Sequence, residues 1–197
     1  MGWEDDQRYE QAFWGSCVNT YGEETKQQVY AERMGLGWGG ADGKWPVIDL
    51  AGRSVLDLGG GPVSLLLKCV NLGAGCAVVD PCGYPDWVTD RYAAHGIQHY
   101  REPGETFDRD ESSDEAWIYN VLQHVEDPEA VARVALEHAP VVRVFEWIRT
   151  GVSVGHPNDL TAELLDGWFA PGRGVIEQLD DRGCVGTAWY GVLEGRA

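Results

Sequence analysis

The segment Val55-Leu-Asp-Leu-Gly-Gly-Gly-Pro62 constrains the fold most, because a short apolar run leads directly into three glycines. The apolar run predicts a buried strand, and glycines at its end let a ligand approach the backbone where side chains would obstruct it. A second run, Cys76-Ala-Val-Val-Asp80, ends in an acid about 20 residues further on, where it can accept hydrogen bonds from ribose hydroxyls. This order predicts a nucleotide or nucleoside site. The alternative is a plain glycine turn followed by a solvated aspartate.

Strand-like and helix-like segments alternate after Ser54, which is typical of a parallel sheet covered by helices. Before Ser54 the sequence predicts two helices. We therefore predict an α/β fold with a doubly wound, mainly parallel seven-stranded sheet and an N-terminal helical lid. The predicted strands are 54–58, 76–80, 97–101, 115–119 and 141–147, with a closing antiparallel pair at 174–179 and 184–192. The predicted helices are 5–14, 23–34, 63–72, 84–94, 127–139 and 158–169.

The glycine loop also bears on the ligand. A dinucleotide site prefers Gly-x-Gly-x-x-Gly, with a pyrophosphate at the helix N-terminus. Here the pattern is Asp57-x-Gly59-x-Gly61, and an acid in that place repels a pyrophosphate but attracts an ammonium group. In this motif the sequence resembles the class I S-adenosylmethionine-dependent methyltransferases, and the resemblance runs from about Ser54 to Trp147. Val63 departs from the pattern, because many members have a third glycine there.

The resemblance implies S-adenosylmethionine as the cofactor and a Rossmann-like methyltransferase domain over residues 51–197. Residues 1–50 would then form the helical lid and acceptor-site segment. The implied cofactor-binding residues are Asp57, Gly59, Gly60 and Gly61 around the amino acid part, Asp80 on the ribose, Glu105 near the adenine, and Asn120 beside the methionine part. The segment Tyr119-Asn-Val-Leu-Gln-His-Val-Glu-Asp-Pro128 is similar to the fourth-strand segment of many small-molecule methyltransferases.

The resemblance further implies methyl transfer to an oxygen or nitrogen nucleophile of a small molecule. A hydroxyl acceptor would need a general base that titrates near neutrality. His124 is the first candidate and His156 the second, while Glu146 could orient either imidazole or contact the acceptor. The alternative for these residues is a structural role in capping helices or bonding to loops. Two other functions stay open, a nicotinamide-dependent oxidoreductase and a non-catalytic protein that kept this fold as an interaction surface.

Five aromatic residues before Ser54 have two possible roles, since they could either close over the cofactor or pack the N-terminal helices on the sheet. They are Tyr9, Phe13, Trp14, Tyr21 and Trp38.

The charge and the cysteine content limit which binding partners and which cellular location we expect. The chain has 32 acidic and 15 basic residues, a net charge of −17, which argues against an extended nucleic-acid footprint. Its five cysteines form no CxxC pair, its first ten residues are acidic and polar, and its apolar runs are short. We therefore expect a cytoplasmic protein with a small-molecule substrate and no membrane partner. We expect no metal site at His95 and His99, and we leave the oligomeric state open.

Overall fold

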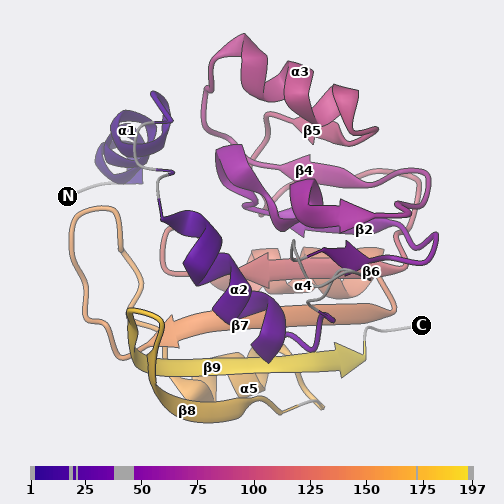
Figure 1. Cartoon of the computed structure of the whole chain (residues 1–197). Coiled ribbons are helices and arrows are strands. Elements are labelled where there is room, and N and C mark those ends of the chain that lie inside the picture. Colours follow the sequence, from indigo (N-terminus) through magenta and orange to yellow (C-terminus); the bar gives the residue numbers. More distant parts are fainter. Residues whose placement is uncertain (1–2, 18–19, 21, 38–46, 172, 195–197) are drawn as a thin grey trace.

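A seven-stranded sheet runs through the centre of the protein in the computed structural model, which describes residues 3–17, 20, 22–37, 47–171 and 173–194 (Figure 1). The strand order is β5-β4-β2-β6-β7-β9-β8. The first five strands pair in parallel, whereas β9 is antiparallel to both β7 and β8. The strands are β2 (Val55–Leu58), β4 (Ala77–Val79), β5 (Gln98–Tyr100), β6 (Glu115–Tyr119), β7 (Val141–Ile148), β8 (Val175–Asp181) and β9 (Cys184–Glu194). The predicted fold class and all seven predicted strands are confirmed.

Helices cover both faces of this sheet because successive side chains of each strand point to opposite faces. One hydrophobic cluster joins Leu56 and Leu58 of β2 to helices α4 (Pro128–His138) and α5 (Ala162–Trp168). The other joins Val55 of β2 to α2 (Glu23–Arg33) and α3 (Asp86–Ala94). Asp57 shares the second face with Val55, so the motif acid points into the core beneath α2 and α3.

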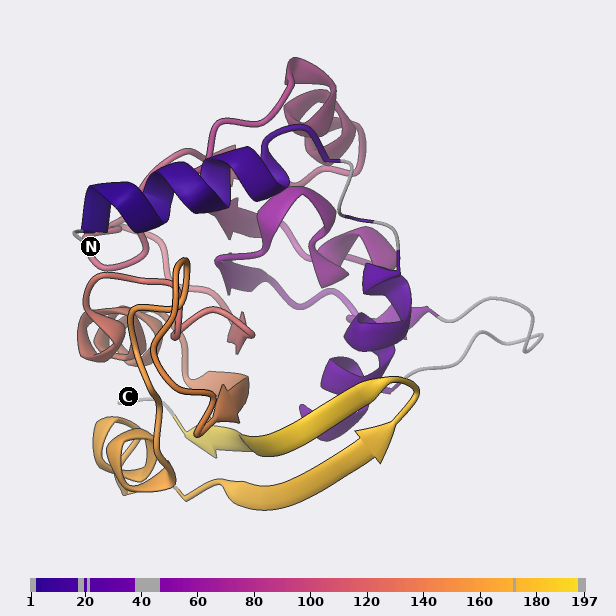
Figure 2. The ribbon, with the colours of Figure 1, turned by 90° about the vertical axis from the view of Figure 1, so that its left-hand side faces the viewer.

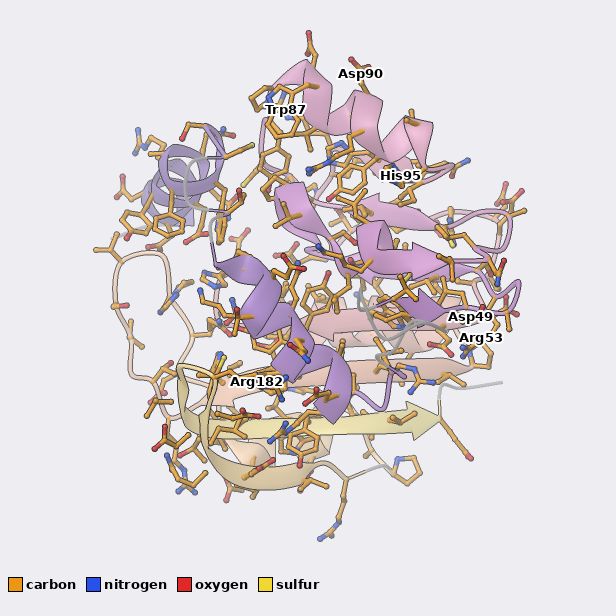
Figure 3. The ribbon with its side chains drawn as sticks, viewed as in Figure 1. Asp49, Arg53, Trp87, Asp90, His95 and Arg182 are labelled. Carbon is orange, nitrogen blue, oxygen red and sulfur yellow. The ribbon has the colours of Figure 1, made fainter. Side chains whose placement is uncertain are left out.

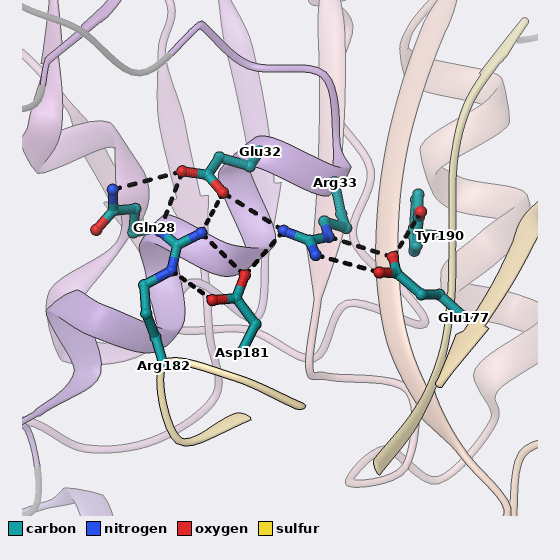
Figure 4. A network of polar contacts seen from close by, with 7 residues as sticks. All are labelled: Gln28, Glu32, Arg33, Glu177, Asp181, Arg182 and Tyr190. Carbon is teal, nitrogen blue, oxygen red and sulfur yellow. Dashed lines mark hydrogen bonds and ion pairs between the residues drawn. The ribbon is translucent and has the colours of Figure 1, made fainter. Parts of the chain in front are cut away.

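The N-terminal helix α2 is built into the same core as the sheet. Its Val29 and Tyr30 are buried, and Tyr30 packs on Phe145 of β7 with ring centroids 4.4 Å apart. At its end, Arg33 donates to Glu177 of β8, and a chain of ion pairs continues through Asp181 (Figure 4). Packing is therefore continuous across residue 50, and the functional division at that point remains a prediction.

The predicted helix over residues 63–72 is wrong. The chain instead forms two short 3₁₀ helices, Gly61–Val63 and Leu65–Lys68, followed by strand β3 (Cys69–Val70), which pairs in parallel with β1 (Ile48–Asp49). Ser64 interrupts the helical path with φ −47° and ψ 146°, because its hydroxyl donates to Asp57 and accepts from the Leu66 amide. Leu65, Leu66 and Cys69 of this segment are buried, whereas Val70 is exposed. Hydrogen bonds around Ser64 decide the backbone path.

Helix α1 (Trp3–Trp14) lies across the edge of the sheet at which the parallel strands end. The arrow of β7 points to the left in Figure 1, which is the side on which α1 lies, and Figure 2 looks onto this edge with α1 lying across it. The loop after β7 reaches the same edge, where the Gly155 amide donates to Asp6 of α1 at 3.0 Å. Over the described ranges, no helix is both long enough and apolar enough to span a membrane.

Candidate active site

A cavity of about 940 Å³, partly open to solvent, lies at the carboxyl edge of β2, β4 and β6. Residues 58–63, 79–82 and 119–121 follow these three strands and contribute to its wall. Helices α1 and α2 contribute side chains from outside the sheet. This is the edge at which open α/β sheets bind their ligands.

The glycine loop needs glycine for two separate reasons. Gly59 has φ +76°, and a Cβ there would lie 2.6 Å from the methyl groups of Val121. Gly60 has an ordinary φ, but its Cβ would lie 2.5 Å from Oδ2 of Asp57. The glycine loop is therefore pressed against Val121, which follows β6, and against the motif acid. Its backbone forms part of the cavity wall, where a side chain would take up the space.

Asp57 lies beneath this loop and does not line the cavity. Its side chain is fully buried, and its Oδ2 accepts hydrogen bonds from the hydroxyls of Ser64 and, at 2.6 Å, Tyr119. Oδ1 is buried without a hydrogen-bond partner among the described residues. Burial raises the pKa of Asp57 to about 7, although the two hydroxyl donors oppose that rise. The Tyr119 hydroxyl also accepts from the Leu65 amide, so Asp57 and Tyr119 together fix the loop that faces the cavity.

Asp80 lies on the cavity wall and accepts hydrogen bonds from its own loop and from the glycine loop. Its Oδ1 accepts from the Cys82 amide at 2.9 Å and the Tyr84 hydroxyl at 2.8 Å, and its Oδ2 accepts from the Gly61 amide at 3.1 Å. Burial raises the pKa of Asp80, and these donors act against the rise. Each carboxylate oxygen has two acceptor sites, so Oδ2 keeps capacity for a ligand hydroxyl.

Asn120 and Glu105 also line the cavity. Asn120 adopts the left-handed backbone region, with φ +57°, and its side-chain oxygen accepts from Nε2 of Gln123 at 2.9 Å. Oε1 of Glu105 accepts from the Glu126 amide at 2.9 Å. The structure thus brings Asp80, Glu105, Asn120 and the three glycines to one cavity, with Asp57 directly behind the loop.

His124 reaches the cavity wall with both ring nitrogens engaged by the protein. Nδ1 lies 2.7 Å from the Gly155 carbonyl oxygen and 3.3 Å from Oε1 of Glu10, so this nitrogen carries a proton. Nε2 lies 3.2 Å from the amide nitrogen of Gln123, which donates to it in the neutral ring. Burial lowers the pKa of His124, but Glu10 and the Gly155 carbonyl more than offset this, and the pKa lies above its usual value.

The other two catalytic candidates lie beside His124 and do not line the cavity. The His156 ring packs edge-on against His124 with centroids 4.5 Å apart, and burial, followed by the charge of His124, lowers the pKa of His156. Glu146 is fully buried and accepts from the amides of Val121 at 2.9 Å and Leu122 at 3.1 Å. Burial raises the pKa of Glu146 to about 7. Its hydrogen bonds hold the loop after β6 rather than an imidazole.

Comparison with known proteins identifies the fold. No protein-family model matches the sequence, and no curated protein matches it significantly. Among solved structures, DhpI in its complex with S-adenosylhomocysteine superposes with a TM-score of 0.63 at 15% identity, covering 99% of this chain and 98% of that one. The 1,6-didemethyltoxoflavin-N1-methyltransferase of Burkholderia thailandensis gives 0.62 at 14% identity, covering 96% and 87%. Magnesium protoporphyrin IX methyltransferase of Synechocystis PCC 6803, with bound S-adenosylmethionine, gives 0.56 at 15%, covering 97% and 98%.

The chain has the S-adenosylmethionine-dependent methyltransferase fold. In this fold, the residues that sequence reasoning missed are those that reach the site from a distance. Glu10, from α1, contacts His124, although nothing in a polar helix singles out one acid among several. Tyr119 was recognised only as a strand residue, because its place in a predicted strand does not indicate that its hydroxyl contacts Asp57.

His95 and His99, at which we expect no metal site, do not line this cavity. His95 follows the last residue of α3 (Figure 3), with Nδ1 2.9 Å from the Arg91 carbonyl oxygen. His99 belongs to β5 and contacts Thr89. The described parts of the chain hold no group of three or more residues suited to a metal ion.

Proposed function

We propose that this protein is an enzyme that transfers a methyl group from S-adenosylmethionine to a nucleophile on a small molecule. The observation that carries the proposal is the contact between the glycine loop and Asp80 at one wall of the cavity. The Gly61 amide donates to Asp80, so a backbone free of side chains and a hydroxyl acceptor face the same space. A nucleoside with an amino acid tail fits these two features.

The cofactor would lie along the carboxyl edge of the sheet. Asp80 would accept from the ribose hydroxyls, and Glu105 would lie near the adenine. The backbone of Gly59–Gly61 and the side chain of Asn120 would face the methionine part. Asp57 would support this part from behind the loop, through the Tyr119 hydroxyl.

S-adenosylmethionine supplies an electrophilic methyl group on a sulfonium, and the chain's residues then have to align the acceptor and exclude water. Helix α1 would help to exclude water from the cavity, because its Glu10 and Trp14 contribute to the wall and its Asp6 holds the loop after β7. Where the acceptor is a hydroxyl, we propose His124 as the base. The His124 Nε2 must then give up its hydrogen bond with Gln123 and accept one from the acceptor hydroxyl. His156 is the alternative base, and Glu146 holds the loop after β6.

Two expectations about partners and location accompany this proposal. Duplex DNA should not bind, because the net charge of −17 repels a phosphate backbone. The five cysteines are all free, which suits the reducing cytoplasm.

The direct test is turnover. Purified protein is incubated with methyl-labelled S-adenosylmethionine and a small-molecule extract, and both S-adenosylhomocysteine and labelled products are measured by mass spectrometry. We expect both to form together in equal amounts. Cofactor binding without any labelled product would favour the non-catalytic alternative, and binding of a nicotinamide cofactor instead would favour the oxidoreductase.

A further inference from the structure

The wall of the cavity is acidic. Among its described residues it carries four carboxylates, Glu10, Glu23, Asp80 and Glu105, and neither lysine nor arginine. His124 is the one basic side chain there, so even its protonated ring leaves an excess of negative charge. Such a wall repels carboxylate and phosphate acceptors and attracts cations.

Two of these carboxylates belong to the lid rather than to the sheet edge. Glu10 comes from α1 and Glu23 from α2, whereas Asp80 and Glu105 follow β4 and β5. In the proposed function the sheet-edge pair faces the nucleoside, which leaves Glu10 and Glu23 for the acceptor. Glu23 is paired with Lys26 at 2.7 Å, but the lysine side chain is half exposed and does not line the cavity.

Glu10 is held in place and keeps capacity for a ligand. It is 7% exposed, its Oε2 accepts from the indole Nε1 of Trp14 at 3.1 Å, and its Oε1 faces His124 Nδ1 at 3.3 Å. A carboxylate accepts about four hydrogen bonds, so each oxygen has a free acceptor site. A buried carboxylate attracts a cation more strongly than an exposed one does, because water screens it less.

Aromatic rings stand beside these acids. Trp14, Tyr30 and Tyr119 all contribute to the wall, and the rings of Tyr30 and Tyr119 lie 6.2 Å apart. Faces of tryptophan and tyrosine bind ammonium groups through their π electrons. A wall that holds both carboxylates and aromatic rings is therefore suited to an organic cation with an apolar body.

The state of His124 favours the same substrate class. A hydroxyl acceptor needs a base in the transition state, and both ring nitrogens of His124 are engaged by Gly155, Glu10 and Gln123. An amine needs no such base, because about one part in a thousand of an alkylamine with the pKa of lysine is already neutral near pH 7.4.

We infer that the methyl acceptor is a basic amine, held as an ammonium ion by Glu10 and Glu23 among the aromatic rings; this rests on the proposed function. The ammonium group first loses a proton to water. Its nitrogen lone pair then forms the new N–C bond while the methyl–sulfur bond breaks and its electron pair returns to sulfur. The products are an N-methylammonium ion and neutral S-adenosylhomocysteine, so the positive charge of the sulfonium ends on nitrogen.

The test compares three probes of matched shape, 2-phenylethylamine, 2-phenylethanol and 3-phenylpropanoate, by saturation-transfer NMR on the full chain saturated with S-adenosylhomocysteine. We expect the amine to bind at least about tenfold more tightly than the alcohol, and the carboxylate to bind more weakly still. Equal binding of all three, preference for the alcohol or the acid, or binding of none would overturn the inference. Calorimetry with S-adenosylhomocysteine alone tests the proposed function separately, because that function requires the cofactor product to bind. If S-adenosylhomocysteine binds but the amine is not preferred, the inference fails and the proposed function stands.

Variants test whether Glu10 and Glu23 cause the preference for the amine. Glu10→Gln and Glu23→Gln should each reduce the preference for the amine over the alcohol by about tenfold, the factor that corresponds to about 1.4 kcal/mol. Glu24→Gln is the matched control, because Glu24 follows Glu23 on α2, is 59% exposed and does not line the cavity. Loss of preference in the control variant, or its retention in both test variants, would contradict the assignment.

Discussion

Replacing Asp57 with asparagine should change how the stability of the protein depends on pH. The side chain is fully buried, and its pKa is raised to about 7, against about 3.9 in the unfolded chain. The folded state therefore binds this proton more tightly than the unfolded state does. The contribution of Asp57 to stability is complete below about pH 4 and is lost as the pH rises through 7. Three pKa units correspond to about 4 kcal/mol, of which about 3 kcal/mol falls between pH 4.5 and 8.5.

The assay is urea unfolding of wild type and Asp57→Asn at a series of pH values across that range. We expect the free energy of unfolding of the variant, relative to wild type, to rise by about 3 kcal/mol from the acidic to the basic end. Asparagine keeps an oxygen that can accept from Ser64 and Tyr119, so the fold should persist. Asp114→Asn is the control, because hydrogen bonds from Ser54 lower the pKa of Asp114. Its contribution is lost only as the pH falls below about 4, so the difference between this variant and wild type should stay nearly constant across the assay range. A difference between wild type and Asp57→Asn that does not vary with pH would refute the reasoning.

Three further changes probe the site. Asp80→Ala should weaken binding of S-adenosylmethionine by about 1.5–3 kcal/mol in calorimetry, through loss of a charged hydrogen-bond acceptor, and unchanged affinity would end its ribose assignment. Gly59→Ala should lower the free energy of unfolding by about 1–3 kcal/mol for the collision with Val121 and about 1–2 kcal/mol for the positive φ; a stable variant that still binds the cofactor would contradict the packing described. His124→Ala should lower kcat by less than about tenfold with an amine acceptor and leave cofactor affinity nearly intact, whereas a loss of 10²–10⁴-fold is typical of removing a general base and would restore that role to His124.

The sequence predicted the parts of the fold that depend on local patterns. Alternating strand and helix signals were enough for the sheet, and Asp127 before Pro128 was a reliable helix start, since the Asp127 side chain caps α4 by accepting from the Ala130 amide at 3.1 Å. The same logic failed over residues 63–72. There the apolar spacing suits a helix, but the hydroxyl of Ser64 bonds to a residue of the preceding strand.

The lining of the cavity was predictable where it is formed by the ends of strands, and less so where it depends on packing between distant segments. Gly59 and Asp80 were found from their order along the chain. The predicted contact of Asp57 with an ammonium group did not foresee its burial behind the loop, because that depends on the Tyr119 hydroxyl from another strand. The docking of Glu10 against His124 joins segments more than 100 residues apart, and no periodicity encodes it.

The central claim is that this cavity binds S-adenosylmethionine, and isothermal titration calorimetry of the purified protein tests it most directly. The account predicts saturable, one-to-one binding of S-adenosylmethionine that Asp80→Ala weakens, and no binding of a reduced nicotinamide dinucleotide at the same concentrations. Absence of S-adenosylmethionine binding, or preference for the dinucleotide, would contradict it.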